Sequence, residues 1–264
     1  MSRRATTVAD FSGAWARTLP AGLSLVVADE IGSTQQLSRR LLARHAEEGE
    51  RPGPFAVLAL AQSAGHGRRA RGWSSGHGLG VWSTLVLPVA AERLQEAPMR
   101  AAVALASALR EASGVDCRLK WPNDLVIAGS KVGGLLVDVT SRGEREAWLA
   151  IGFGVNHGHG ADALPTPAAT SLALRLPPGR PLPPLEEVAA RLLTALWHEL
   201  TGDGDGWLER YRELSAHRPG DPLVCELPDG VVEGRFAGFE EHGFLRLATD
   251  AGERVIRSGE VYSW

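Results

Sequence analysis

The sequence has little cysteine. Cys117 and Cys225 are the two cysteines among 264 residues, and neither belongs to a CxxC pair or a Cys/His cluster. A disulfide framework and a structural zinc site are therefore not expected, and we assign no metal-ligating residues. Such sparse cysteine is typical of a protein from a reducing compartment, so we expect a cytoplasmic location.

Long apolar runs are also missing. None approaches the roughly 18 apolar residues of a membrane span, and the opening "MSRRATTVADFSGAW" has two arginines with no apolar stretch behind them. We therefore expect neither a secretory signal nor a membrane partner. The formal net charge of -3 argues against general nucleic-acid binding, although it allows a local basic site.

Lysine is almost absent. Lys120 and Lys131 are the only lysines among 28 basic residues, and both fall within "KWPNDLVIAGSK". An ammonium and a planar guanidinium differ chemically, so lysines retained in an arginine-rich chain mark positions where arginine does not serve. Chance is the alternative explanation.

Apolar patterning predicts an α+β fold. Strands are predicted at 23–30, 55–61, 79–88, 118–122, 124–129, 131–139 and 148–156, and helices at 33–49, 98–113, 185–200 and 207–215. Ser33 and Gln36 form a capping-box pattern at the first helix. Because the strands outnumber the helices and follow one another in hairpins, we expect a mixed, mainly antiparallel sheet with helices packed on it.

The end of the chain has a different character. A proline-rich connector at 176–184 precedes the last helices, and after "HRPGDPL" short strands alternate with the turns "PDG", "EEHG" and "DAG". This pattern is typical of a small β-barrel. We therefore divide the chain into residues 1–217 and 218–264.

The segment "AGHGRRARGW", residues 64–73, is a basic glycine-rich loop. No acidic residue occurs between Glu50 and Glu92. The glycines of the loop allow sharp turns that bring backbone N–H groups near an anion, and the arginines of the loop can form paired hydrogen bonds with phosphate oxygens. The GxxxxGK[ST] pattern of a P-loop is absent. The alternative is a solvated hairpin loop that is basic by accident.

Three further segments can carry chemistry. In "KWPND", Pro122 restricts Trp121 and would hold Lys120 rigidly, unless Trp121 is simply core and the following residues a turn. In "KVGGLLVD", two glycines stand close to Lys131. Glycines within a strand indicate that the backbone approaches another group closely or that the strand bulges. "IGFGVN" ends in Asn156, an amide suited to a purine edge but common in turns.

Taken in order, these motifs resemble the biotin–protein ligases. The array consists of "ST" (33–34), "QSAGHGRRARGW" (62–73), "KWPNDL" (120–125), "KVGGLLVD" (131–138), "IGFGVN" (151–156) and "SGEV" (258–261). The resemblance implies a class II synthetase-like catalytic domain followed by an SH3-like barrel. It also implies an activity: biotin and ATP, with Mg²⁺, give biotinyl-5′-AMP, and biotin passes to a lysine of a carboxylase's biotin carboxyl carrier domain.

The resemblance implies roles for individual residues. Lys120 and Arg68 would be catalytic, offsetting charge where the biotin carboxylate meets the α-phosphate. Biotin would contact Ser33, Thr34, Gln35, Gln62, His66, Gly67, Arg68, Lys120, Gly152 and Gly154. ATP or the adenylate would contact Arg68, Arg71, Trp73, Lys120, Asn123, Lys131 and Asn156. Asn123 or Asp124 is also a candidate to touch magnesium or ribose.

The chain departs from the family pattern at four positions. Ala70 stands where glycine is common, which should stiffen the loop slightly. Gln35 replaces the usual asparagine and either keeps the contact with a longer arm or faces solvent. His66 replaces the first arginine of the loop, and its charge would titrate near neutrality if the side chain is used. Asp138 replaces a glutamate, and we expect this change to be structural.

Other functions remain to be weighed against biotin ligation. A lipoate or octanoate ligase or transferase would share the architecture, although the arginine–glycine loop and "KWPND" favour biotin. A biotin-responsive repressor needs a helix-turn-helix, and fewer than 25 residues precede the first predicted strand, so we expect no DNA partner. A catalytically inactive biotin sensor is supported by His66 and Gln35 alone.

Overall fold

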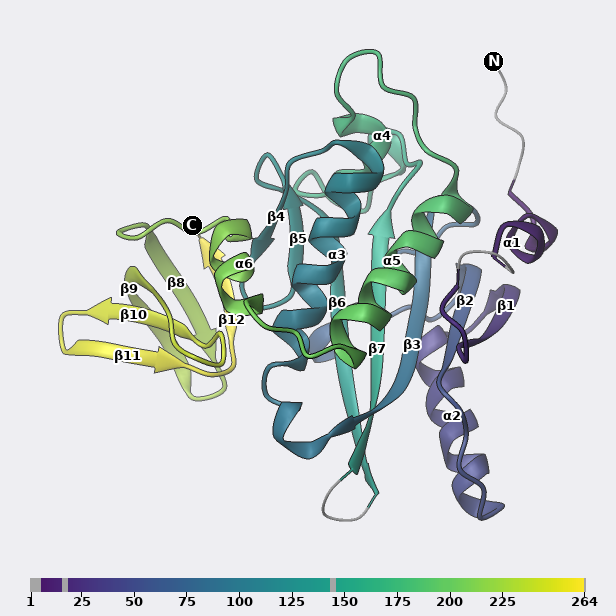
Figure 1. Ribbon diagram of the computed structural model, residues 1–264. Helices are drawn as coiled ribbons and strands as arrows, with labels where there is room; N and C mark the ends of the chain where they lie inside the picture. The colour runs from purple at the N-terminus through teal and green to yellow at the C-terminus, as the bar shows by residue number, and fades with distance from the viewer. Residues whose placement is uncertain (1–5, 16–18, 143–145, 264) are drawn as a thin grey trace.

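The computed structural model describes residues 6–15, 19–142 and 146–263, which form two sheets and their helices (Figure 1). The larger sheet has the order β1-β2-β3-β7-β6-β5-β4. Its strands are β1 (Ser24–Ile31), β2 (Phe55–Gln62), β3 (Gly80–Ala90), β4 (Cys117–Lys120), β5 (Asp124–Ile127), β6 (Ser130–Arg142) and β7 (Glu146–Asn156). β1 and β2 pair in parallel and the other neighbours pair antiparallel. The predicted α+β fold with a mixed, mainly antiparallel sheet is confirmed.

Helices cover both faces of this sheet. They are α1 (Val8–Trp15), α2 (Thr34–Glu47), α3 (Ala97–Ser113), α4 (Leu172–Arg175), α5 (Leu185–Thr201) and α6 (Trp207–Leu214). Successive residues of a strand point to opposite faces. Accordingly, Leu149 and Ile151 of β7 join the core with α3 and α5, whereas Trp148 and Ala150 join a smaller cluster with Leu42 of α2. The sheet therefore separates a main core from the α2 side.

The predicted start of α2 is confirmed, whereas two helices were not predicted. The side chain of Ser33 does cap α2 and accepts from the backbone N–H of Gln36 at 3.5 Å, as the capping pattern predicts. α3 buries Ala101, Ala104 and Leu105 as well as Met99 and Val103, so its buried residues extend beyond a single face. α3 lies between the sheet, α5 and α6, so it is covered on several sides. α1 and α4 have no counterpart in the prediction.

The smaller sheet is formed by the end of the chain. Its order is β11-β10-β9-β8-β12, all antiparallel. The strands are β8 (Pro222–Leu227), β9 (Gly230–Phe239), β10 (Leu245–Thr249), β11 (Gly252–Ile256) and β12 (Glu260–Ser263). Residues 215–217 still pair with β4 of the larger sheet, through Ala216 N–H to Leu119 C=O at 2.8 Å. The division at 217/218 stays a prediction.

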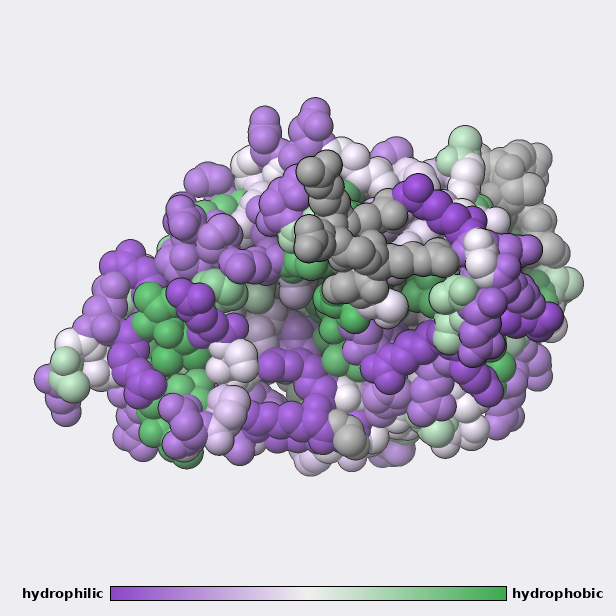
Figure 2. Space-filling model, turned by 90° about the horizontal axis from the view of Figure 1, so that it is seen from below, coloured by the Kyte–Doolittle hydropathy of each residue, from purple (hydrophilic) through white to green (hydrophobic). Residues whose placement is uncertain are grey.

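Among the described residues, no helix is long and apolar enough to cross a membrane. Seen from below, hydrophilic residues dominate the surface, and hydrophobic ones gather on the side of the C-terminal sheet (Figure 2).

Candidate functional site

A cavity of about 300 Å³ lies on the α2 side of the larger sheet. Its wall is formed by the start of α2, the loop between β2 and β3, the paired strands β6 and β7, and the loop after β7. The cavity brings together every predicted site residue except Lys120: Ser33, Thr34, Gln35, Gln62, His66, Gly67, Arg68, Arg71, Trp73, Asn123, Lys131, Gly152, Gly154 and Asn156. Segments more than 100 residues apart in sequence thus form one wall.

One end of the cavity is polar and uncharged. The Thr34 backbone N–H donates to Gln62 Oε1 at 2.8 Å, and the Gln62 amide nitrogen donates to Ser75 Oγ at 2.9 Å. The hydroxyl oxygens of Thr84 and Thr34 lie 2.9 Å apart, and the Thr34 hydroxyl donates to Gln62 Oε1 at 3.2 Å. These bonds fix the orientation of the Gln62 amide and of the Thr34 hydroxyl, so this end of the cavity presents fixed donors and acceptors.

Gln35 is held inside this end and does not face solvent. Its amide nitrogen donates to Asp138 Oδ2 at 2.7 Å and to the Ala150 carbonyl at 2.9 Å, and its Oε1 accepts from Thr84. The alternative that Gln35 points into solvent is wrong, because its side chain is buried against β7. Both amide N–H groups are engaged by the protein. Asp138 also accepts from Arg39 at 2.5 Å, which agrees with a structural role for this position.

Gly152 makes room for that buried amide. A Cβ on Gly152 would collide with Gln35 Oε1. The glycine of β7 is therefore required by the longer side chain at position 35 as well as by anything that binds in the cavity.

The basic loop folds back as a small hairpin. His66 bridges to Gly72, the Trp73 N–H donates to the Gly65 carbonyl at 2.9 Å, and the Gly67 N–H donates to the Arg71 carbonyl at 2.8 Å. Arg69 occupies the left-handed region, with φ of 53°. The alternative of a simple solvated hairpin does not hold, because the loop's arginines contact the C-terminal sheet.

Two arginines of the loop pair with acids of that sheet. Arg71 forms an ion pair with Glu260 at 2.6 Å and donates to the Tyr262 hydroxyl at 2.8 Å. Arg69 pairs with Glu226 at 2.9 Å, and Glu226 accepts from the Tyr262 hydroxyl. Five side chains, from the basic loop and from the C-terminal sheet, thus share one network. Glu226 and Tyr262 were not among the predicted site residues, since no local motif marks them.

Arg68 connects the basic loop to the segments "KWPND" and "SGEV". Its guanidinium donates to the Gly259 carbonyl at 3.0 Å and to Asn123 Oδ1 at 3.4 Å. Burial lowers the pKa of this guanidinium from its ordinary value, and the nearby Glu260 carboxylate acts in the opposite direction. Arg68 is therefore a partly desolvated cation on the cavity wall, where an anion would meet little competition from water.

Trp73 and Lys131 lie next to each other on the cavity wall. Lys131 Nζ lies 2.5 Å from Asp124 Oδ1 and 5.4 Å from the centre of a Trp73 ring. A Cβ on Gly154 would come within 2.6 Å of Trp73 Nε1. Gly154 therefore lets the indole lie flat against β7, where it forms a platform next to a cation.

We expect Gly154→Ala to displace this indole. Overpacking of this kind costs about 1–3 kcal/mol, so the free energy of unfolding should fall and tryptophan fluorescence should shift. Denaturant unfolding measures the first and an emission spectrum the second. Gly160→Ala is the matched control, because a Cβ there meets nothing within 4 Å. Equal effects of the two variants would contradict the proposed packing.

Lys120 lies beside the cavity and not on its wall. It is the last residue of β4, directly opposite Asp124 of β5. Burial lowers the pKa of its ammonium below the ordinary value, whereas Asp124 and Glu260 raise it and Lys131 lowers it further. Because Asp124 and Glu260 also line the cavity, the ammonium is within electrostatic reach of it. The alternative that Trp121 belongs to the core is confirmed, since its side chain is buried.

The loop after β7 supplies wall residues that the sequence did not reveal. Pro165, Thr166, Ala168 and Ala169 line the cavity. This loop is held by Lys131, whose N–H donates to the Ala168 carbonyl at 2.8 Å and whose carbonyl accepts from Thr170 at 2.7 Å. The Asn156 amide donates to the Thr170 carbonyl at 2.9 Å. No motif marks the loop, and only its pairing with β6 brings it here.

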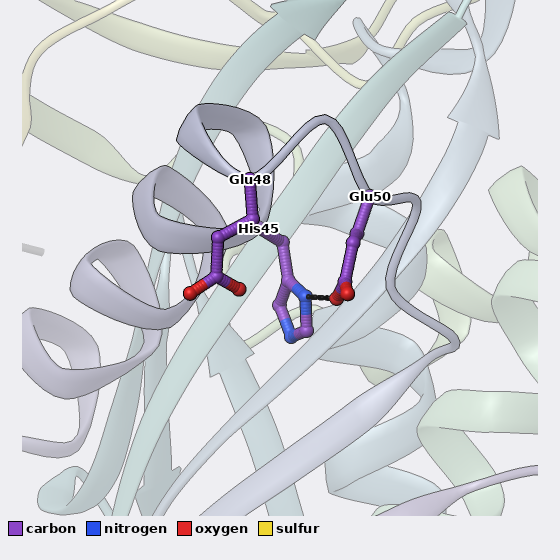
Figure 3. Close-up of side chains that lie close together, drawn as sticks. All are labelled: His45, Glu48 and Glu50. Atoms are coloured by element: carbon purple, nitrogen blue, oxygen red, sulfur yellow. Dashed lines mark hydrogen bonds and ion pairs between the residues drawn. The ribbon is translucent and has the colours of Figure 1, made fainter.

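One group of acidic and histidine side chains lies elsewhere. His45, Glu48 and Glu50, at the end of α2, are the one such trio among the described residues with ligand atoms close enough to share a metal (Figure 3). His45 Nδ1 bonds to Glu50 at 3.0 Å, and Glu48 pairs with Arg44 at 2.8 Å. The trio is partly exposed and lies outside the cavity wall, so we assign no metal to it.

Comparison with known proteins identifies the family. Residues 27–156 match the Biotin/lipoate A/B protein ligase family, and residues 224–264 match the Biotin protein ligase C terminal domain. A biotin–[acetyl-CoA-carboxylase] ligase of Paracoccus denitrificans is 34% identical over 219 residues, covering 78% of this chain and 89% of that protein. The chain belongs to the biotin protein ligase family.

Two further relatives extend the match. The bifunctional ligase/repressor BirA of Bacillus spizizenii is 28% identical over 264 residues, covering 91% of this chain and 74% of that protein. The structure of the Aquifex aeolicus biotin protein ligase with biotin and ATP superposes with a TM-score of 0.68 at 22% identity, covering 90% of this chain and 97% of that one. At that identity the structural likeness bears on the fold. The C-terminal match is specific to biotin ligases and does not favour the lipoate alternative.

Proposed function

We propose that this biotin protein ligase family member activates biotin with ATP to biotinyl-5′-AMP and transfers the biotinyl group to a lysine of a carboxylase's carrier domain. One observation carries the assignment of the site: a single cavity joins an uncharged polar end, built by Thr34 and Gln62, to a cationic end built by Arg68 and Lys131. The uncharged polar end suits the cyclic urea of biotin, and the cationic end suits the biotin carboxylate and the phosphates of the nucleotide.

In the first step the biotin carboxylate attacks the α-phosphorus of ATP. A carboxyl O–P bond forms, the bond to pyrophosphate breaks, and the mixed anhydride results. Two anions must approach each other, so preorganised cations in a water-poor site lower the barrier. Arg68 supplies one such charge from the wall, and we assign the second to Lys120, which would extend toward the reacting atoms from the end of β4.

The nucleotide would occupy the cationic end. Lys131 and Arg71 would face its phosphates, while Trp73 and Asn156 would contact the base. Arg71 is paired with Glu260, so it would hold the loop closed through the C-terminal sheet and place Arg68. His66 and Gly67, in the same loop, would cover the acyl chain with backbone groups, and Gly152 would leave space for the ring.

In the second step the amine of the carrier lysine attacks the acyl carbon. An amide bond forms, the bond to the phosphate oxygen breaks, AMP leaves, and the amine loses a proton. No described side chain is assigned as the base, because a low-dielectric site lowers the pKa of the amine itself. Arg68 and Lys120 would stabilise the departing phosphate.

Mg²⁺ would enter with ATP. The carboxylates on the cavity wall are Asp124 and Glu260, and oxygen ligands of this kind suit the ion. Asp124 is paired with Lys131 and Glu260 with Arg71, so a magnesium ion would share these carboxylates with the two cationic side chains. We also propose a cytoplasmic location. The absence of a DNA partner stays a prediction.

The proposal is tested by incubating the protein with a biotin carrier domain, ATP, Mg²⁺ and biotin. The carrier should gain the mass of one biotinyl group, and the gain should require ATP. Parallel reactions with lipoate or octanoate should leave the carrier unchanged. Modification with lipoate alone would contradict biotin ligation, and failure with biotin under all these conditions would favour an inactive biotin-binding protein.

A second expectation concerns self-modification. The sequence contains two lysines with which biotinyl-AMP could react. Lys131 is paired with Asp124, and Lys120 is half-buried. Peptide mapping by mass spectrometry should therefore find almost no biotin on the enzyme's own lysines after turnover. Gln36→Lys, at an exposed position next to the capped start of α2, should become labelled. Heavy labelling of Lys120 or Lys131 in the wild type would contradict this.

A further inference from the structure

The segment between α6 and β8 forms hydrogen bonds with the backbone on both sides of Lys120. The Ala216 N–H donates to the Leu119 carbonyl at 2.8 Å. The Trp121 N–H donates to the imidazole Nε2 of His217 at 3.2 Å. Lys120 therefore lies between two residues whose main chains bond to the same short segment. Its ammonium can move, but the peptide units that carry it are fixed.

His217 is built for this contact. Its side chain is 2% exposed, and its ring centre lies 5.6 Å from that of Phe236 in β9. Ser215 Oγ accepts from the His217 N–H at 3.0 Å and donates to the His217 carbonyl at 3.2 Å. The residue is thus held by its own backbone, by the C-terminal sheet and by the Trp121 amide.

The charge state of the imidazole fits the contact. Burial, and after it the nearby Lys120 ammonium, lower the pKa of His217 to about 4, whereas Asp221 raises it. The ring is therefore neutral at neutral pH. A nitrogen that accepts from an amide N–H carries no proton, so the proton is on Nδ1. Protonation at Nε2 would place two donors face to face.

We propose that His217 is a positioning residue for biotin activation, which fixes the Trp121 amide and thereby the place from which Lys120 reaches the reacting carboxylate. This inference rests on the proposed catalytic role of Lys120. It also gives the C-terminal sheet a part in catalysis, because Phe236 packs on the ring that holds the lysine segment.

The first test compares two variants of the same residue. His217→Leu removes the acceptor, and the rate constant for biotinyl-AMP formation should fall about tenfold, the scale of one lost hydrogen bond, with little change in KM for biotin. His217→Gln, whose amide oxygen can accept from the same N–H, should recover most of the rate. Phe239→Leu is the control, since it loosens the same sheet beside Phe236 and leaves the His217 imidazole in place as an acceptor. A matching loss in this control would overturn the proposal.

A double-mutant cycle then separates positioning from general stabilisation. If His217 acts through Lys120, His217→Leu should slow biotinyl-AMP formation no further in a Lys120→Met background. Independent, multiplying losses would overturn the proposal, as would a His217→Gln variant no better than His217→Leu. If Lys120→Met alone kept the wild-type rate, the catalytic role of Lys120 would be wrong instead. Amide hydrogen exchange at Trp121, measured on each folded variant, should accelerate in His217→Leu only.

Discussion

Lys120→Ala should slow the formation of biotinyl-AMP by on the order of 10²–10³-fold, the range for losing one preorganised charge contact at a developing transition state. Lys120→Arg should also form biotinyl-AMP much more slowly than the wild type, because a planar guanidinium cannot occupy the place of a compact ammonium. Pyrophosphate release under saturating biotin and ATP measures both rates. A near wild-type rate for Lys120→Arg would contradict the role given to this lysine.

The matched comparison is Lys131→Ala, the chain's other lysine. Lys131 lines the cavity, pairs with Asp124 and lies over Trp73. Its loss should weaken ATP binding and raise KM for ATP more than it lowers the maximal rate. If Lys131→Ala abolished adenylate formation while Lys120→Ala left it intact, the two roles would have to be exchanged.

Arg68→Ala should release the activated intermediate into solution. Arg68 connects the loop to Gly259 and Asn123, and hydrogen bonds from a charged group are worth about 1.5–3 kcal/mol each. Opening the loop lets water and foreign amines reach the anhydride. An exposed bystander protein should therefore acquire biotin about 10- to 100-fold faster than with the wild type, as measured by mass spectrometry.

Arg71→Ala and Arg40→Ala complete that experiment. Arg71 holds the loop from outside through Glu260 and Tyr262, so its loss should also increase bystander labelling, although less. Arg40 is exposed on α2 and its loss should have no effect. Unlabelled bystander protein with Arg68→Ala would contradict a covering role for the loop.

Much of the fold followed from local patterning. The strand at 148–156 and the capped start at Ser33 are predicted from neighbours within a few residues, and both are confirmed. The resemblance to the biotin–protein ligases implied the site residues, and all of them but Lys120 line the cavity.

The misses share a physical cause. Whether Gln35 faces solvent depends on Asp138 and Ala150, which lie more than 100 residues away. The cavity residues of 165–169 carry no motif and reach the site through pairing with Lys131. Glu226 and Tyr262 matter through arginines of the basic loop between β2 and β3. Contacts of this kind are set by tertiary packing, which no local periodicity encodes.

The central claim is that the Lys120 ammonium shares the negative charge where the biotin carboxylate meets the α-phosphate. A crystal structure with biotin and a non-hydrolysable ATP analogue tests it most directly. The account predicts Lys120 Nζ within hydrogen-bonding distance, about 2.7–3.2 Å, of oxygens at that junction. A complex with both ligands bound, Lys120 turned away and Lys131 at the junction, would contradict it.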